Sequence, residues 1–328
     1  MIGTGRLRAL GGFLMGTIAW CLIAAPALAA YPERAIRLIV PFPPGGTSDQ
    51  VARLIATPLA NRLKQPVLIE NRSGLNGIIG TEILARSAPD GYTFALLPSG
   101  HAINGSLNTL SYDTEKSFTP LLLIGTVPLL AVVNPASPAT TFPKFIEMAR
   151  TAAKPMSFKS GGIGGSDHLA TELLMRSAGI KMLNVPYKGD PPAAVDLAGG
   201  QIDFGLFNIT SVLQLVKAGR LRALAVSSEQ RSPLLPDLPT VDESGVKGYT
   251  AGSWHAFFGP AGMPVDVVRQ LNTEMNAILK TPEIAKQLAE LGISIEGGGP
   301  DKLGGFLSVE VAKWARIIRD AGITPEKK

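Results

Sequence analysis

The sequence predicts a two-domain α/β protein with a hinge of crossing strands and a ligand cleft between the domains. Apolar runs rich in β-branched residues alternate with amphipathic stretches from Ile36 onward, a pattern typical of βαβ units and a mostly parallel, buried sheet. A glycine-pair segment occurs once in each half, as GGTSDQVA from Gly45 and GGSDHLA from Gly164. The length of 328 residues exceeds what one hydrophobic core usually organises.

Nine short runs have strand composition, and they lie at 36–40, 67–70, 93–97, 129–133, 156–160, 182–186, 204–207, 221–226 and 256–258. The first helix follows Gly46, and Pro58 should kink it or end it early. Near the C-terminus the pattern is purely helical, and Pro264, Pro282 and Pro300 stand where helices can begin.

The second half looks inserted into the first. The strand at 129–133 ends at Asn134-Pro135, and the chain returns at 253–259 before the terminal helices. This order predicts one domain from 30–130 plus 253–328 and a second from 131–252. Two strands would then cross between the domains and act as a hinge.

The N-terminus predicts a secretory signal peptide over residues 1–29. Arg6 and Arg8 precede an uncharged apolar stretch that ends in a small-residue exit, so cleavage is expected after Ala29 or Ala30. The single cysteine, Cys21, falls inside this leader, so the mature chain offers no disulfide, thiol nucleophile or thiolate metal site.

Composition and motifs exclude several functions. The 31 basic residues are scattered among 26 acidic ones, with no basic run interleaved with aromatics, so nucleic-acid binding is not expected. The GxxxxGK[ST] phosphate loop, the HExxH metal motif and the GxSxG nucleophile elbow are all absent from the sequence. We therefore predict no catalytic residues, no metal and no cofactor.

The two glycine segments are the strongest candidate site. Each follows a strand-like run and opens a helix-like run, so each should present free backbone N–H groups that attract an anion. Paired glycines let the backbone turn sharply near a ligand, and nearby hydroxyls can serve either the helix or the ligand. An ordinary capped strand-to-helix turn is the alternative for either copy alone. The candidate residues are Gly45, Gly46, Thr47, Ser48, Gly164, Gly165 and Ser166.

Other candidates have two open interpretations. Asp49 and Asp167 fit first-turn acids that complement the helix dipole. His168 could donate to a ligand or pack, and His101 follows a strand at the edge where α/β sheets bind ligands. Trp254, with His255 and Phe257, could line the cleft at the proposed crossover or fill the core.

A resemblance to a known family spans the mature chain. The blocks that carry it include Pro44-Gly45-Gly46 with Asp49, Ala88-Pro89-Asp90-Gly91-Tyr92, Val185-Pro186-Tyr187-Lys188-Gly189, Gly199-Gly200-Gln201-Ile202-Asp203 and Leu238-Pro239-Thr240-Val241. In order and spacing the chain resembles the Bug family of solute-binding proteins. Its departures, such as Pro58 inside the first helix, leave the glycine loops intact.

The resemblance implies a periplasmic binding subunit of a tripartite tricarboxylate transporter, built as two α/β domains that close on a carboxylate. A monomer suits such a hinge mechanism. It implies that the loops from Phe42 to Asp49 and from Gly162 to His168 hold that carboxylate. It also places Asp203 and Asn208 where family members order the pocket or contact the far end of the ligand. A sensory accessory that presents the ligand to a sensor kinase, and a secreted two-domain α/β enzyme, are the alternatives.

Overall fold

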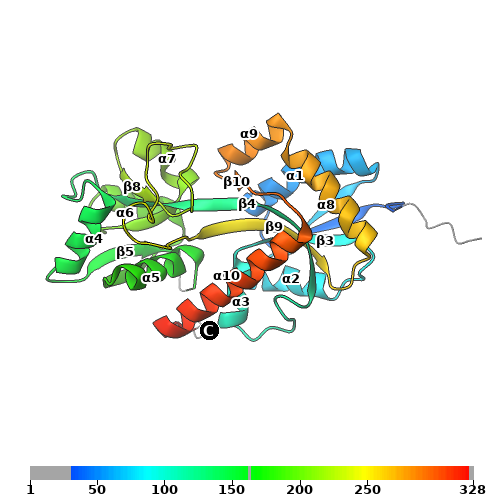
Figure 1. Ribbon diagram of the computed structural model, residues 1–328, viewed down its shortest axis with the longest axis horizontal. Coiled ribbons are helices and arrows are strands. Elements are labelled where there is room, and N and C mark those ends of the chain that lie inside the picture. The colour runs from blue at the N-terminus through cyan, green and yellow to red at the C-terminus, as the bar shows by residue number, and fades with distance from the viewer. Residues whose placement is uncertain (1–30, 162–163, 325–328) are drawn as a thin grey trace, which may run out of the picture.

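A computed structural model of the chain describes residues 31–161 and 164–324. The expected leader, its cleavage site and Gly162 of the second glycine loop lie outside the described residues. Two lobes lie side by side along the long axis of the molecule, and strands β4 (Phe118–Val133) and β9 (Gly252–Pro260) run from one into the other (Figure 1).

The first lobe is built from both ends of the chain. Its N-terminal elements are β1 (Ile36–Val40), α1 (Thr47–Leu63), β2 (Val67–Asn71), a short 3-10 turn (Leu75–Gly77), α2 (Ile78–Ala85), β3 (Thr93–Pro98) and α3 (Gly100–Leu107). Its C-terminal elements are α8 (Val265–Leu279), α9 (Pro282–Glu290), β10 (Ser294–Ile295) and α10 (Pro300–Ala321).

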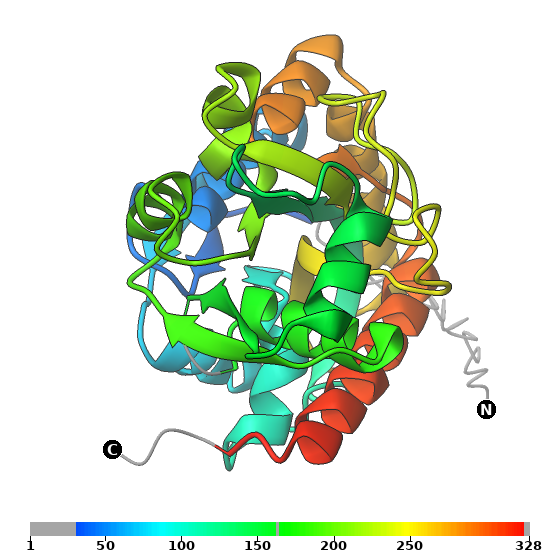
Figure 2. The ribbon, with the colours of Figure 1, turned by 90° about the vertical axis from the view of Figure 1, so that its left-hand side faces the viewer.

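The second lobe comes from the middle of the chain and faces the viewer in Figure 2. Its elements are α4 (Phe142–Thr151), β5 (Met156–Ser160), α5 (Ser166–Ala178), β6 (Met182–Pro186), α6 (Asp190–Ala198), β7 (Gly205–Asn208), α7 (Ile209–Lys217) and β8 (Arg222–Val226). Helix α10 runs along one side of the molecule and contacts α5, so it also joins the two lobes (Figures 1 and 2).

The sheet is mixed, which corrects the expectation of a mostly parallel one. Strand β1 pairs in parallel with β2 and β3, and β5 pairs in parallel with β6. Strand β9, however, is antiparallel to both of its neighbours, β3 and β4, and β4 is antiparallel to β7 and β8. The two crossing strands thus bring antiparallel pairing into both lobes.

Strand β4 changes partners along its length. Residues Phe118 to Pro128 pair with β9, and Leu129 to Val133 pair with β7 and β8. Its first part was not predicted from sequence, because Pro120 and Gly125 interrupt the apolar pattern. The register shifts next to both residues, as expected for bulges that accommodate proline and glycine. The domain limits of 30–130 plus 253–328 and 131–252 remain a prediction.

Helix α1 continues through Pro58 to Leu63, so the expected early end is wrong. A proline inside a helix costs about 3 kcal/mol, because it removes one backbone hydrogen bond and crowds the preceding turn. Val51, Ile55 and Leu59 on the same helix are completely or almost completely buried against the sheet. Burying three such side chains contributes roughly 5–9 kcal/mol, which outweighs the cost of the proline.

Strand β9 sends alternate side chains to opposite faces of the sheet, as any strand does. Trp254 and Phe258 belong to the cluster that α10 and the second lobe share, whereas Phe257 packs with α1 and α8. His255 therefore lies on the α1 face and Trp254 on the α10 face, although the two residues are adjacent.

Candidate ligand-binding site

The two glycine segments adopt the same backbone conformation. Gly45 and Gly164 are left-handed, with φ of 83° and 77°, and this conformation is one that glycine adopts without strain. Gly46 and Gly165 follow in extended conformation, with φ/ψ of −73°/167° and −64°/154°. The predicted positive φ therefore holds for the first glycine of each pair only.

Gly46 and Gly165 are the N-caps of α1 and α5, and no side chain among the described residues caps either helix. The first amides of an α-helix have no acceptor within the helix, and a glycine cap supplies none. Thr47, Ser48 and Ser166 stand in the first turns, one or two residues after these glycine N-caps. The two helix ends thus carry amides that are oriented for an anion and reinforced by the helix dipole.

Asp49 holds the first loop in place. Its carboxylate accepts hydrogen bonds from Gly45 N at 2.9 Å, from Asn71 Nδ2 at 2.9 Å and from Arg53 Nε and a terminal guanidinium nitrogen at 2.8 and 3.0 Å. The guanidinium of Arg53, followed by the Gly45 and Asn71 hydrogen bonds, lowers the pKa of Asp49 to about 2 against opposing desolvation. This buried anion supports the loop, and its oxygens already accept from protein donors, so Asp49 is not one of the proposed ligand contacts.

Asp167 has the corresponding role in the second loop. It accepts from Gly161 N at 2.6 Å and from the ammonium of Lys159 at 2.7 Å. His168 closes the same loop, because its Nδ1 accepts from Gly164 N at 3.1 Å. Burial lowers the pKa of His168, and the neutral ring then carries its proton on Nε2. His168 thus serves the loop backbone.

Lys159 is a site residue that sequence reasoning missed. Its side chain is 1% exposed, and its ammonium lies 2.7 Å from Asp167, 2.6 Å from Asp190 and 4.7 Å from the ring centre of Phe207. Asp190 also accepts from the backbone and side-chain amides of Asn208. Lys159 therefore ties together the starts of α5, α6 and α7. A lysine inside a predicted strand, next to Phe158, was the available signal.

Phe42 is half-buried beside the first loop, and its ring lies next to Gly77. A Cβ on Gly77 would approach that ring to 3.2 Å. Asn71 also donates to the Phe42 carbonyl at 3.0 Å. The residue that leads into the glycine pair is therefore held by Gly77 at its ring and by Asn71 at its backbone.

Three residues that were predicted to contact the ligand lie away from the two glycine loops. His101 is buried among Tyr112, Phe118 and Phe258, and neither ring nitrogen makes a hydrogen bond of ordinary geometry among the described residues. Trp254 is 1% exposed and donates to Glu310 at 3.1 Å. Asp203 accepts from the amide and hydroxyl of Ser157, at the start of β5 and away from the α5 loop. We leave these three out of the proposed contacts.

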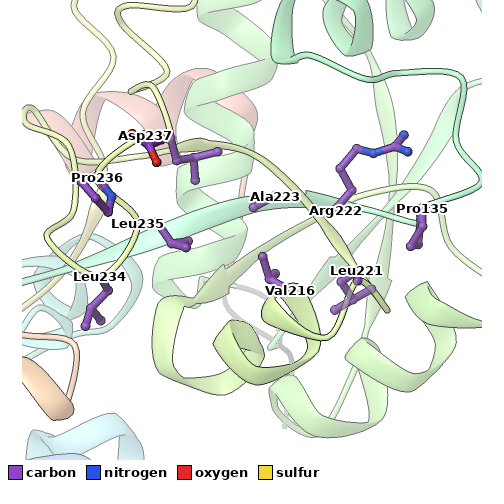
Figure 3. A pocket seen from close by; sticks show the side chains of 11 residues that line it. Pro135, Val216, Leu221, Arg222, Ala223, Leu234, Leu235, Pro236 and Asp237 are labelled. Carbon is purple, nitrogen blue, oxygen red and sulfur yellow. The ribbon is translucent and has the colours of Figure 1, made fainter.

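A hollow of about 550 Å³ lies on the second lobe, beside α7 and β8, and Figure 3 shows the side chains around it. It contains none of the candidate residues. Its lining is formed by Pro135, Val216, Gly219, Leu221, Arg222, Ala223, Leu234, Leu235, Pro236, Asp237 and Leu238.

Within the described part of the chain, no cluster of three or more His, Cys, Asp or Glu residues is arranged to hold a metal ion. Residues 31–161 and 164–324 contain no helix long and apolar enough to span a membrane.

Solved structures define the class of protein. The periplasmic binding protein BugD is 35% identical, with a TM-score of 0.71, and the match covers 90% of this chain and 100% of BugD. Rpa4515 from R. palustris, solved with adipate, is 36% identical with a TM-score of 0.75, covering 90% and 99%. MatC from Rhodopseudomonas palustris, solved with malate, is 29% identical with a TM-score of 0.71, covering 88% and 100%.

The fold is thus that of two-domain periplasmic binding proteins. Residues 51–323 match the model of the tripartite tricarboxylate transporter family receptors. The chain belongs to this family of Bug-type solute-binding proteins, which confirms the resemblance found in the sequence.

Proposed function

We propose that this protein captures a small carboxylate in the periplasm, between its two lobes, and delivers it to a tripartite tricarboxylate transporter. One observation carries the proposal: α1 and α5 begin with the same left-handed and extended glycine pair, and no side chain in the described part of the chain caps them. The proposed contacts are the amides and hydroxyls of Thr47 and Ser48, which follow the Gly46 cap, with the amide of Gly165 and the amide and hydroxyl of Ser166 from the other lobe.

Hydrogen bonds from such a site can supply the free energy needed for micromolar binding of a carboxylate. A hydrogen bond to a charged group contributes about 1.5–3 kcal/mol, so four of them give roughly 6–12 kcal/mol before the costs of association. A micromolar dissociation constant corresponds to about −8 kcal/mol. Closure of the lobes and contacts to the rest of the ligand would supply the remainder.

The ligand class is narrowed by the chemistry of the site and by its relatives. Backbone amides at helix N-termini recognise a carboxylate by its charge and its acceptor oxygens. Two relatives were solved with the dicarboxylates adipate and malate. Dicarboxylates are therefore the first compounds to test, with tricarboxylates, acidic amino acids and aromatic acids after them.

Thermal unfolding of the chain from residue 30, against a panel of these acids with amides and sugars as controls, tests binding. An acid at 100 times its dissociation constant stabilises the folded state by about 2.7 kcal/mol, which raises the midpoint measurably. Shifts with uncharged compounds only, or with none, would contradict the proposal. Loss of uptake of the bound acid after deletion of the gene tests the transporter role.

The domain limits at 30–130 plus 253–328 and 131–252 are part of the proposal, with β4 and β9 as the hinge. Small-angle scattering with and without the bound acid tests it, because closure about two strands reduces the radius of gyration. The same experiment measures the mass in solution, which we expect to be that of a monomer.

A further inference from the structure

Ser48 and His255 meet at the start of α1. Ser48 occupies the second position of this 17-residue helix, and His255 lies in β9 between β3 and β4. The hydroxyl oxygen of Ser48 is 3.2 Å from Nε2 of His255, and both residues are more than nine-tenths buried. The two residues are 207 positions apart, so only the crossing strand brings them together.

The hydroxyl of Ser48 has no other partner among the described residues. Hydroxyls inside helices often donate to the carbonyl four residues earlier, as Thr81 does to Gly77. Ser48 makes no such bond in the part of the chain that the structure describes. Its proton is therefore free for a group outside the helix, unless His255 accepts it.

The surroundings of the imidazole decide between these two arrangements. Nδ1 of His255 is buried and has no hydrogen-bond partner among the described residues. Burial also lowers the pKa of His255 to about 4, so the ring is neutral at pH 7 and carries one proton. A proton on Nδ1 would be a buried donor without an acceptor, and orphaned buried donors are rarer than under-satisfied acceptors. The proton belongs on Nε2, which donates to Ser48.

We propose that His255 is a positioning residue for the carboxylate site: by donating to Ser48 Oγ, it turns the Ser48 hydroxyl proton toward the ligand at the start of α1. This inference rests on the proposed function, because it takes the α1 N-terminus as the carboxylate anchor. An ionised carboxylate only accepts hydrogen bonds, so this arrangement favours the acid over its primary amide, whose NH₂ group donates.

The test is a double-mutant cycle on Ser48→Ala and His255→Leu, read by calorimetric titration. Adipate is the probe if it shifts the unfolding midpoint of the wild type, and malate otherwise. Ser48→Ala should weaken binding by about tenfold or more, the equivalent of one hydrogen bond to a charged group. His255→Leu should weaken it several-fold, and the double variant should bind as Ser48→Ala does, because His255 acts through the hydroxyl.

His255→Gln provides the matched control, since its side-chain amide can still donate to Ser48, and it should recover most of the affinity. A merely structural role for His255 predicts losses that add in the double variant, together with no recovery in His255→Gln, and either result overturns the inference. Failure of the wild type to bind adipate, malate or any panel acid contradicts the proposed function instead. Unfolding midpoints confirm that each variant is folded. If His255→Leu does not fold, His255→Met, which removes the donor in an unbranched apolar side chain, takes its place in the cycle.

Discussion

Gly46→Asp separates the binding role of the first glycine loop from its role in folding. Gly46 has φ −73° and ψ 167°, which any L-residue adopts, and the nearest atom to a new Cβ is the Pro43 carbonyl oxygen at 3.6 Å. Aspartate is among the preferred N-cap residues, because its carboxylate accepts from the second or third amide of the helix. The variant would place a covalent carboxylate where we propose that the ligand carboxylate binds.

The expected effects on stability and on affinity differ greatly. Asp is better than Gly at an N-cap by only a few tenths of a kcal/mol, so the unfolding free energy should hardly change. Losing two hydrogen bonds to a charged ligand costs about 3–6 kcal/mol, which corresponds to at least 100-fold in affinity, before charge repulsion is counted. Gly165→Asp makes the same substitution at α5 and should have the same effect if both loops bind one carboxylate.

Calorimetric titration with the panel acid that shifts the midpoint most gives the affinity, and thermal unfolding gives the stability. Gly299→Asp is the matched control, because Gly299 caps α10 with φ −81° and ψ 168°, without a side-chain cap and with nothing within 4 Å of a new Cβ. It should gain the same cap and keep full affinity. A folded Gly46→Asp protein that binds with wild-type affinity would refute the proposed site.

Further predictions concern buried charge. Lys159→Met should destabilise the fold by about 3–5 kcal/mol in chemical denaturation, because it leaves the buried Asp190 and the partly buried Asp167 without their cation, and adding Asp190→Asn should recover part of this loss. Stability should fall between pH 6.5 and pH 4, because burial lowers the pKa of His101 and of His255 to about 4 in the folded state, and the unfolded chain binds the protons first. Each histidine accounts for roughly 3 kcal/mol of that fall, so His101→Phe should flatten the stability curve measured from pH 7 to pH 4. Asp49→Asn should lower stability at pH 7 and approach the wild type as the pH falls from 4 to 2, because only the wild type loses its Asp49 contribution there.

Three results would contradict these predictions. Wild-type stability in Lys159→Met would mean that the ammonium contributes nothing net to the second lobe. An unchanged slope in His101→Phe between pH 7 and pH 4 would assign the acid sensitivity to other groups. An Asp49→Asn protein that tracks the wild type at every pH would show that the carboxylate does not hold the first loop.

The sequence by itself determined the local elements and predicted the anchor. The strand at 36–40 and the helix after Gly46 depend on side chains a few residues apart, so their patterns are visible without tertiary information. The glycine pairs were recognisable for the same reason, since a sharp turn before an uncapped helix requires only adjacent residues. Repetition of the pair in both halves indicated a shared ligand.

Only the tertiary structure decided which side chains meet. Trp254 and His255 are adjacent in a crossing strand, and the period of two sends the first to Glu310 and the second to Ser48. The pairing direction of β9, and the charges that surround Lys159, depend on elements distant in the chain. Local patterns specify turns and helix starts through short-range sterics, whereas these contacts depend on how the whole sheet is assembled, which no short window of sequence contains.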